Sequence, residues 1–311
     1  MGDESDHTLH FGYYASPTEG ETATLRLKRP AARDELDRAS DAATVIRSWL
    51  IESPFHRLRL ADQALNNLVG RLSKEDAPGD GLSEARQVQS VVSDWLSKFR
   101  AFDDQTSHFL SRQYNPDRHP DRPAELAAFK QSLSLEYDLN SAYRFCAKLR
   151  NYAQHAGDPL QNIRFSTKEA SAGNQVHLSL EFHPAKLLER YDEWGAVVRK
   201  ELEKAPKAVG ARPVLLSAFL SCERAFASLV SSEERRLCEA AEVLESFDGS
   251  ANEGHPTFFS IGLRPGVPGG GSSTIDVIHV RTDWAASARR TLSQSKDLLM
   301  KPHHVELLRV F

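Results

Sequence analysis

Three polar residues with complementary chemistry lie close together at Arg150, Asn151 and His155. Asn151 and His155 are four residues apart, so on a helix they stack on one face, and the long side chain of Arg150 can reach the same edge. A histidine transfers protons near neutral pH, and an arginine holds an anion in a two-point contact. An asparagine one turn back can hydrogen-bond an imidazole ring and orient it. The spacing therefore predicts a catalytic group for an anionic substrate.

Cleavage of RNA without a metal ion requires these groups. The histidine can move protons on and off the 2′-oxygen or the leaving 5′-oxygen, and the arginine can stabilise charge on the phosphate. His155 is expected in the last turn of a helix ended by Gly157, where the negative end of the helix dipole favours an imidazolium. A second interpretation remains open, in which Arg150 pairs with an acid and His155 only caps a solvated helix end.

The segment from Leu149 to Pro159, Leu-Arg-Asn-Tyr-Ala-Gln-His-Ala-Gly-Asp-Pro, resembles the signature of the HEPN families. That signature is an arginine, usually a polar residue next, and a histidine after four to six intervening positions. Here Asn151 occupies the polar position. The resemblance implies a helical bundle and metal-independent endoribonuclease activity with Arg150, Asn151 and His155 as catalytic residues. It also implies a homodimer whose two Arg/His sets face each other across a cleft, often in toxin or anti-phage defence roles.

Apolar residues recur at helical spacing through most of the chain. Helices are predicted over residues 34–50, 54–72, 88–110, 124–135, 138–155 and 213–247, with further starts at His183 and Asp283. Ser53 followed by Pro54 is typical of an N-cap and the first helical residue. In the helix that carries the candidate site, a stripe of Leu139, Ala142, Cys146 and Leu149 is expected to face a core.

Alternating apolar residues, the period of a strand, interrupt the helices. They occur at residues 8–14, 22–27, 163–166, 176–182, 258–261 and 275–280. The first two runs predict a β-hairpin, and so do 163–166 and 176–182. The predicted fold class is α+β and predominantly α-helical, a HEPN-like helical bundle with added β-hairpins. We expect an N-terminal hairpin over 1–32 that packs on the bundle, the bundle itself over 33–158, and a C-terminal α+β extension over 159–311. Whether the extension and the bundle form one domain is left open.

Composition limits the setting of the protein. The net charge of −4 over 311 residues argues against a basic surface that coats nucleic acid, although a local basic pocket is compatible with it. Three cysteines without a pairing motif indicate reduced thiols, and the acidic N-terminus lacks the features of a secretory signal. No run approaches the roughly 20 apolar residues of a membrane span. We therefore expect a cytoplasmic protein without a membrane association.

No cofactor and no metal are predicted, because His177 and His183 lack a third ligand at zinc spacing. The leading hypothesis is a metal-independent endoribonuclease that acts by 2′-hydroxyl attack, as a toxin or defence effector. Its expected partners are an RNA substrate, a second copy of the chain and, as a candidate, an antitoxin protein. The alternative is a dimeric HEPN-like binding or scaffold protein that performs no chemistry.

Overall fold

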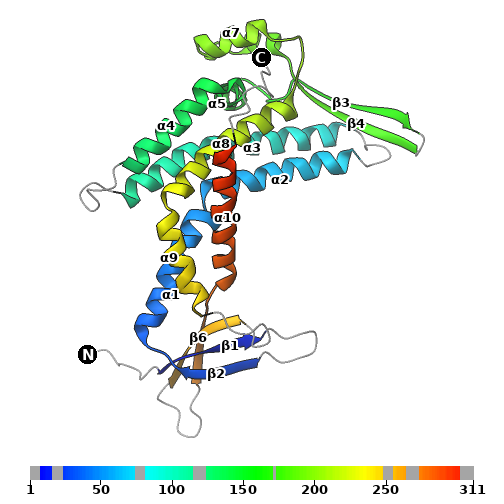
Figure 1. Cartoon of the computed structure of the whole chain (residues 1–311). Coiled ribbons are helices and arrows are strands. Elements are labelled where there is room, and N and C mark those ends of the chain that lie inside the picture. The colour runs from blue at the N-terminus through cyan, green and yellow to red at the C-terminus, as the bar shows by residue number, and fades with distance from the viewer. Residues whose placement is uncertain are drawn as a thin grey trace. The chain divides into compact units, whose positions relative to one another are not determined.

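The computed structural model describes residues 8–15, 24–73, 81–114, 124–170, 173–247, 255–263 and 273–301. The chain divides into two compact units, one of residues 1–52 with 233–294 and the other of residues 53–232 with 295–311. Helices predominate in both, and each contains one small antiparallel sheet (Figure 1). The predicted α+β, mainly helical fold class is therefore confirmed.

The first unit combines a four-stranded sheet with helices. Its elements are β1 (Thr8–Ala15), β2 (Thr24–Pro30), α1 (Arg33–Ile46), the π-helix η1 (Arg47–Ile51), α9 (Glu234–Glu245), β6 (His255–Leu263), β7 (Ser273–His279) and the first part of α10 (Thr282–Met300). The strand order is β2-β1-β6-β7 with antiparallel neighbours throughout. Phe11 of β1 packs against Phe258 of β6 and Phe247, with ring centroids 5.4 and 5.6 Å apart, and α1 packs against α9.

The predicted N-terminal hairpin is part of a larger, four-stranded sheet. The strands β1 and β2 pair as expected, but β1 also pairs with β6, in a register that places Phe11 opposite Phe258. An isolated two-stranded hairpin is marginal in water, and two further strands provide the apolar face that it lacks. The predicted boundary between residues 32 and 33 therefore does not separate two units, since α1 belongs with this sheet.

The second unit is built around a helical bundle. Its elements are α2 (Pro54–Leu72), α3 (Leu82–Gln113), α4 (Ala124–Leu139), α5 (Ser141–His155), β3 (Asn162–Ala170), β4 (Gly173–Phe182), α6 (Pro184–Arg190), α7 (Ala196–Lys204), β5 (Val209–Gly210), α8 (Ala211–Ser232) and the end of α10. Helix α2 packs against α3, and α5 packs against α3, α7 and α8. Ser53 caps α2 as predicted, because its hydroxyl accepts a hydrogen bond from the amide of His56 at 3.1 Å.

Helix α8, which lies within the predicted 159–311 extension, is part of this bundle. It packs against α4 and α5, and more than half of its residues are buried. The predicted 213–247 helix is two helices, α8 and α9, and the division between the units falls between them. Among the described residues α8 is the one helix that is long and apolar enough to cross a membrane, contrary to expectation. Of its most apolar window, 67% is buried inside the protein, as in the core helix of a soluble protein.

Candidate functional site

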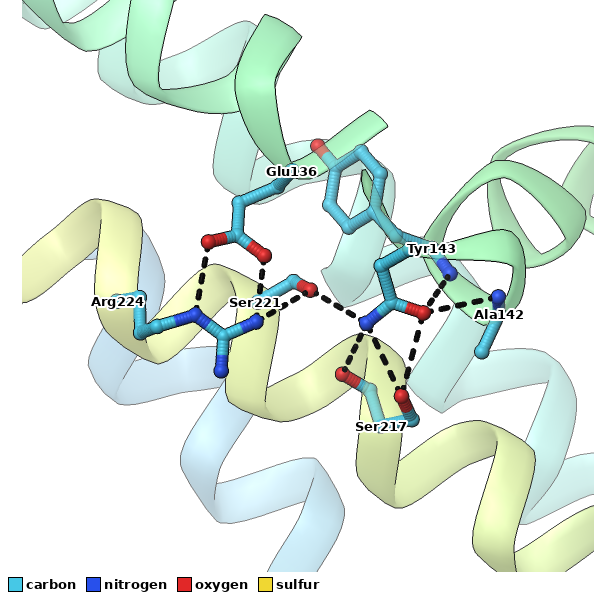
Figure 2. Close-up of polar contacts among 7 residues, drawn as sticks. Glu136, Ala142, Tyr143, Ser217, Ser221 and Arg224 are labelled. Carbon is cyan, nitrogen blue, oxygen red and sulfur yellow. Dashed lines mark hydrogen bonds and ion pairs between the residues drawn. The ribbon is translucent and has the colours of Figure 1, made fainter. Parts of the chain in front are cut away.

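The three predicted site residues lie at the C-terminal end of α5. The helix begins after Asn140, whose side-chain oxygen accepts hydrogen bonds from the amides of Ala142 and Tyr143 at 3.0 and 3.4 Å. This amide also donates to the hydroxyls of Ser217 and Ser221 on α8, at 3.0 and 2.9 Å. Figure 2 shows this network. The start of α5 is therefore fixed on α8 by hydrogen bonds.

Part of the predicted 138–155 helix is wrong. Helix α4 continues to Leu139, and Asn140 separates it from α5 because its backbone is extended, with φ −117° and ψ 108°. Leu139 falls at this break and is 42% exposed, whereas Ala142, Cys146 and Leu149 are completely buried as predicted. Asparagine favours such a break because its side chain can replace the missing backbone acceptor at a helix start.

Arg150 is half-buried and has no acid partner among the residues that the structure describes. Its Nη1 donates to the side-chain oxygen of Asn151 at 3.3 Å, and its Nε is buried without a hydrogen-bond partner. No carboxylate in the described part of the chain forms an ion pair with it, which removes the interpretation of Arg150 as one half of a salt bridge there. A guanidinium that is partly withdrawn from water and lacks an anion is stabilised by binding one, because the anion neutralises a charge that water solvates poorly.

His155 is the last residue of α5 and is exposed. The structure differs from the expected contact, because Asn151 accepts from Arg150 and, among the described residues, no group hydrogen-bonds the His155 ring. Asn151 therefore orients the arginine and not the histidine. The exposed imidazole at the C-terminal end of α5 is therefore open to a ligand from outside.

The chain after His155 is held in place by two glutamines that sequence reasoning missed. Gln89 of α3 donates to the carbonyl of Leu160 at 2.6 Å and accepts from its amide at 3.1 Å. Gln161 donates to the carbonyls of Asp158 and Pro159 at 3.1 and 3.0 Å. Nothing in the sequence marks Gln89 for this role, since its partner is 71 residues away.

An aromatic cluster supports the same end of the helix. Tyr152 is completely buried and stacks on Trp194, with ring centroids 5.7 Å apart, and Tyr191 meets both rings edge-on. Trp194 is also buried, and its indole donates to the carbonyl of Leu187 at 3.2 Å. Trp194 is thus a core residue, and the three rings pack against the C-terminal end of α5.

The remaining reactive groups of this region do not form a second catalytic set. Burial raises the pKa of the Cys146 thiol on α5, which disfavours the nucleophilic thiolate. Glu181 has a lowered pKa because Asn162 donates a hydrogen bond to it, with smaller contributions from Ser179 and His183. Within the described ranges, no group of three or more histidine, cysteine, aspartate and glutamate residues is placed to hold a metal ion.

Comparison of the chain with models of protein families, with curated proteins and with solved structures finds no match in any of the three. The likeness to the HEPN families therefore rests on residues 149–159 themselves. What the site can do has to be argued from the contacts of Arg150, Asn151 and His155.

Proposed function

We propose that the protein is a metal-independent endoribonuclease of HEPN type whose active site is the C-terminal end of α5. The observation that carries the proposal is the state of Arg150, a half-buried arginine without a carboxylate partner in the described part of the chain. It lies five residues before an exposed histidine, His155. An RNA phosphate supplies the anion that Arg150 lacks, and His155 supplies the proton transfer.

The reaction proposed is an internal transesterification. The 2′-oxygen of the substrate forms a bond to phosphorus, the bond from phosphorus to the 5′-oxygen breaks, and the products are a 2′,3′-cyclic phosphate and a free 5′-hydroxyl. The 2′-hydroxyl loses its proton to a base, and the leaving 5′-oxygen gains one from an acid. His155 performs one of these transfers, while Arg150 stabilises the charge that builds on the phosphate oxygens. DNA is not a substrate because it lacks the nucleophile.

A test begins with the purified protein, total RNA and transfer RNA in EDTA. We expect cleavage that persists in EDTA and leaves cyclic-phosphate ends. His155→Ala and Arg150→Ala each reduce the rate by on the order of a hundredfold or more, since a positioned acid–base group contributes roughly 10²–10⁴. Arg150→Lys does not restore the rate fully, because an ammonium cannot make the two-point contact.

The matched controls are His108→Ala and Arg112→Ala. Both residues are exposed and lie four positions apart near the C-terminal end of α3. Both variants are expected to cleave at the wild-type rate. A requirement for magnesium, or a His155→Ala protein that cuts RNA as fast as wild type, would contradict the proposal.

The setting proposed is a cytoplasmic toxin or anti-phage effector that acts as a homodimer, with an antitoxin as a candidate partner. One observation favours a second function, a dimeric scaffold without chemistry. In the described residues no group orients the His155 ring, whereas catalytic histidines are normally held by a hydrogen bond. Binding of RNA by wild-type protein without cleavage would favour the scaffold.

A further inference from the structure

A second arginine lies beside the turn that follows His155. Arg190 is the last residue of α6 and is exposed. A Cβ atom built on Gly157 would lie 3.8 Å from Arg190 Nη1 and 3.3 Å from the hydroxyl of Tyr152. Gly157 follows His155 by two residues, so their Cα atoms are at most about 7.6 Å apart. The guanidinium of Arg190 and the imidazole of His155 therefore flank one short segment of chain.

The charge of Arg190 is not neutralised by an acid of its own. Within the described part of the chain it forms no ion pair, although several acids are close in sequence. Asp192 lies 3.8 Å from Arg199, and Glu193 accepts from the Tyr191 hydroxyl at 3.3 Å. Asp158, next to Gly157, is exposed. An exposed guanidinium that forms no ion pair with these acids is available to an anionic ligand.

The helix that carries Arg190 and the turn beside it are both held by packing and hydrogen bonds. Its helix is anchored by Leu187, which is buried and whose carbonyl accepts from the Trp194 indole. The facing turn is fixed by Gln89 and by the buried ring of Tyr152. Gly157 has a φ of +157° that other residues rarely adopt, and a Cβ there would lie only 3.3 Å from the Tyr152 hydroxyl, so a glycine suits this turn. The spacing between Arg190 and the end of α5 is thus set by packed elements.

We propose that Arg190 is a substrate-binding residue that holds a second phosphate of the RNA, next to the phosphate held by Arg150. The proposal rests on the proposed ribonuclease function. Two phosphate contacts on either side of His155 suit a single strand or a loop, because a flexible backbone can present successive phosphates to both arginines. Since phosphate contacts carry no sequence information, Arg190 contributes affinity and register, and it does not select a base.

The test separates binding from chemistry. Binding of a fluorescent, fully 2′-O-methylated oligonucleotide, which cannot undergo 2′-hydroxyl attack, is measured by anisotropy over a series of salt concentrations. Cleavage of an unmodified oligonucleotide in EDTA then gives kcat and KM. We expect Arg190→Gln to raise Kd and KM about tenfold and to change kcat by less than about threefold. The slope of log Kd against the logarithm of the salt concentration should fall by about 0.7, the change expected for one lost phosphate contact with a single strand. Arg190→Lys keeps the charge and most of the salt dependence.

The matched control is Arg199→Gln on α7, an exposed arginine whose guanidinium already contacts Glu203 at 3.3 Å. It removes the same charge and should leave Kd, KM and the salt dependence unchanged. If Arg190→Gln equals wild type while His155→Ala abolishes cleavage, the second phosphate site is wrong and the ribonuclease stands. If wild-type protein neither binds nor cleaves RNA, both proposals are overturned. An equal effect of Arg199→Gln would also contradict a specific role for Arg190.

Discussion

Arg144 and Arg150 are six residues apart on the same helix and have opposite surroundings. Arg144 forms an ion pair with Glu201 on α7 and donates to the carbonyl of Asp138. Arg150 donates to the side-chain oxygen of Asn151 and forms no ion pair with a residue that the structure describes. The sequence cannot distinguish the two, because the partner of Arg144 lies 57 residues away. The short motif identified the residues correctly as neighbours on a helix, but only the fold shows which arginine is left without an acid.

A substitution at Asn151 tests directly whether Arg150 binds the substrate phosphate. In Asn151→Asp the new carboxylate replaces an oxygen that already accepts from Arg150 at 3.3 Å, so it forms an ion pair and competes with the substrate phosphate. We expect cleavage to fall further in Asn151→Asp than in Asn151→Ala, with KM rising in the former. The measurement is steady-state kinetics in EDTA. An Asn151→Asp protein as active as Asn151→Ala would mean that Arg150 does not bind the phosphate.

At the scale of elements, periodicity predicted most helices and strands but not the partners that they find. The hairpin β3–β4 was expected from alternation within residues 163–182, and it is present. The pairing of β1 with β6 joins residues some 250 positions apart in the sequence, for example Phe11 with Phe258. Local patterns carry no information about such a pairing. The break at Asn140 was missed for a related reason, because the hydroxyls that accept hydrogen bonds from its side-chain amide belong to α8, far away in the sequence.

The break between α4 and α5 depends on Asn140, and its loss should be costly. Asn140→Ala removes the cap of α5 and leaves Ser217 and Ser221 without their amide donor, which we expect to lower the free energy of unfolding by about 2–3 kcal/mol. Ser53→Ala, which removes only the cap of α2, should cost about 1 kcal/mol. Urea denaturation of both variants checks this. An Asn140→Ala protein no less stable than Ser53→Ala would show that the contacts with α8 contribute little.

An ion pair close to Asn140 joins α4 to α8. Arg224 donates to both carboxylate oxygens of Glu136 at 2.8 and 2.6 Å, and the Glu136 side chain is only 3% exposed (Figure 2). Glu136→Met leaves the guanidinium without its acid and should cost about 3–5 kcal/mol. The double variant with Arg224→Met should recover most of that loss, because no charge is then left unpaired. Urea denaturation measures both, and a double variant as unstable as the single one would contradict this account.

At the scale of the whole chain, the sequence predicted an α+β protein, and the two compact units of the structure have bounds that differ from the predicted segments. A boundary at residue 158 would separate α5 from α8, yet α8 packs against α4 and α5 and is buried along most of its length. A helix apolar on nearly all sides has to lie inside a core. The candidate site and its supports, from Gln89 to Trp194, all belong to the second unit. Each unit combines two segments that are far apart in the sequence, 1–52 with 233–294 and 53–232 with 295–311, and composition along the chain carries no information about such a division.

Assembly provides the last prediction. Internal transesterification uses a base at the 2′-oxygen and an acid at the 5′-oxygen, and one chain presents a single histidine, His155, at the end of α5. A two-fold axis beside this end would bring a second His155 and a second Arg150 to the same phosphate. We therefore expect a homodimer that buries at least roughly 1,000 Å² in total. Light scattering at tens of micromolar should give twice the mass of one chain.

Subunit mixing then tests whether the two copies share a site. When wild-type protein is refolded with an excess of His155→Ala, most wild-type chains pair with an inactive partner. If each phosphate needs both histidines, activity per wild-type chain falls toward zero as the excess grows. If each chain carries a complete site, that activity stays constant. A protein that remains monomeric with and without RNA, or a mixture that keeps its full activity per wild-type chain, would contradict a shared site, since neither outcome lets the two His155 side chains act on one phosphate.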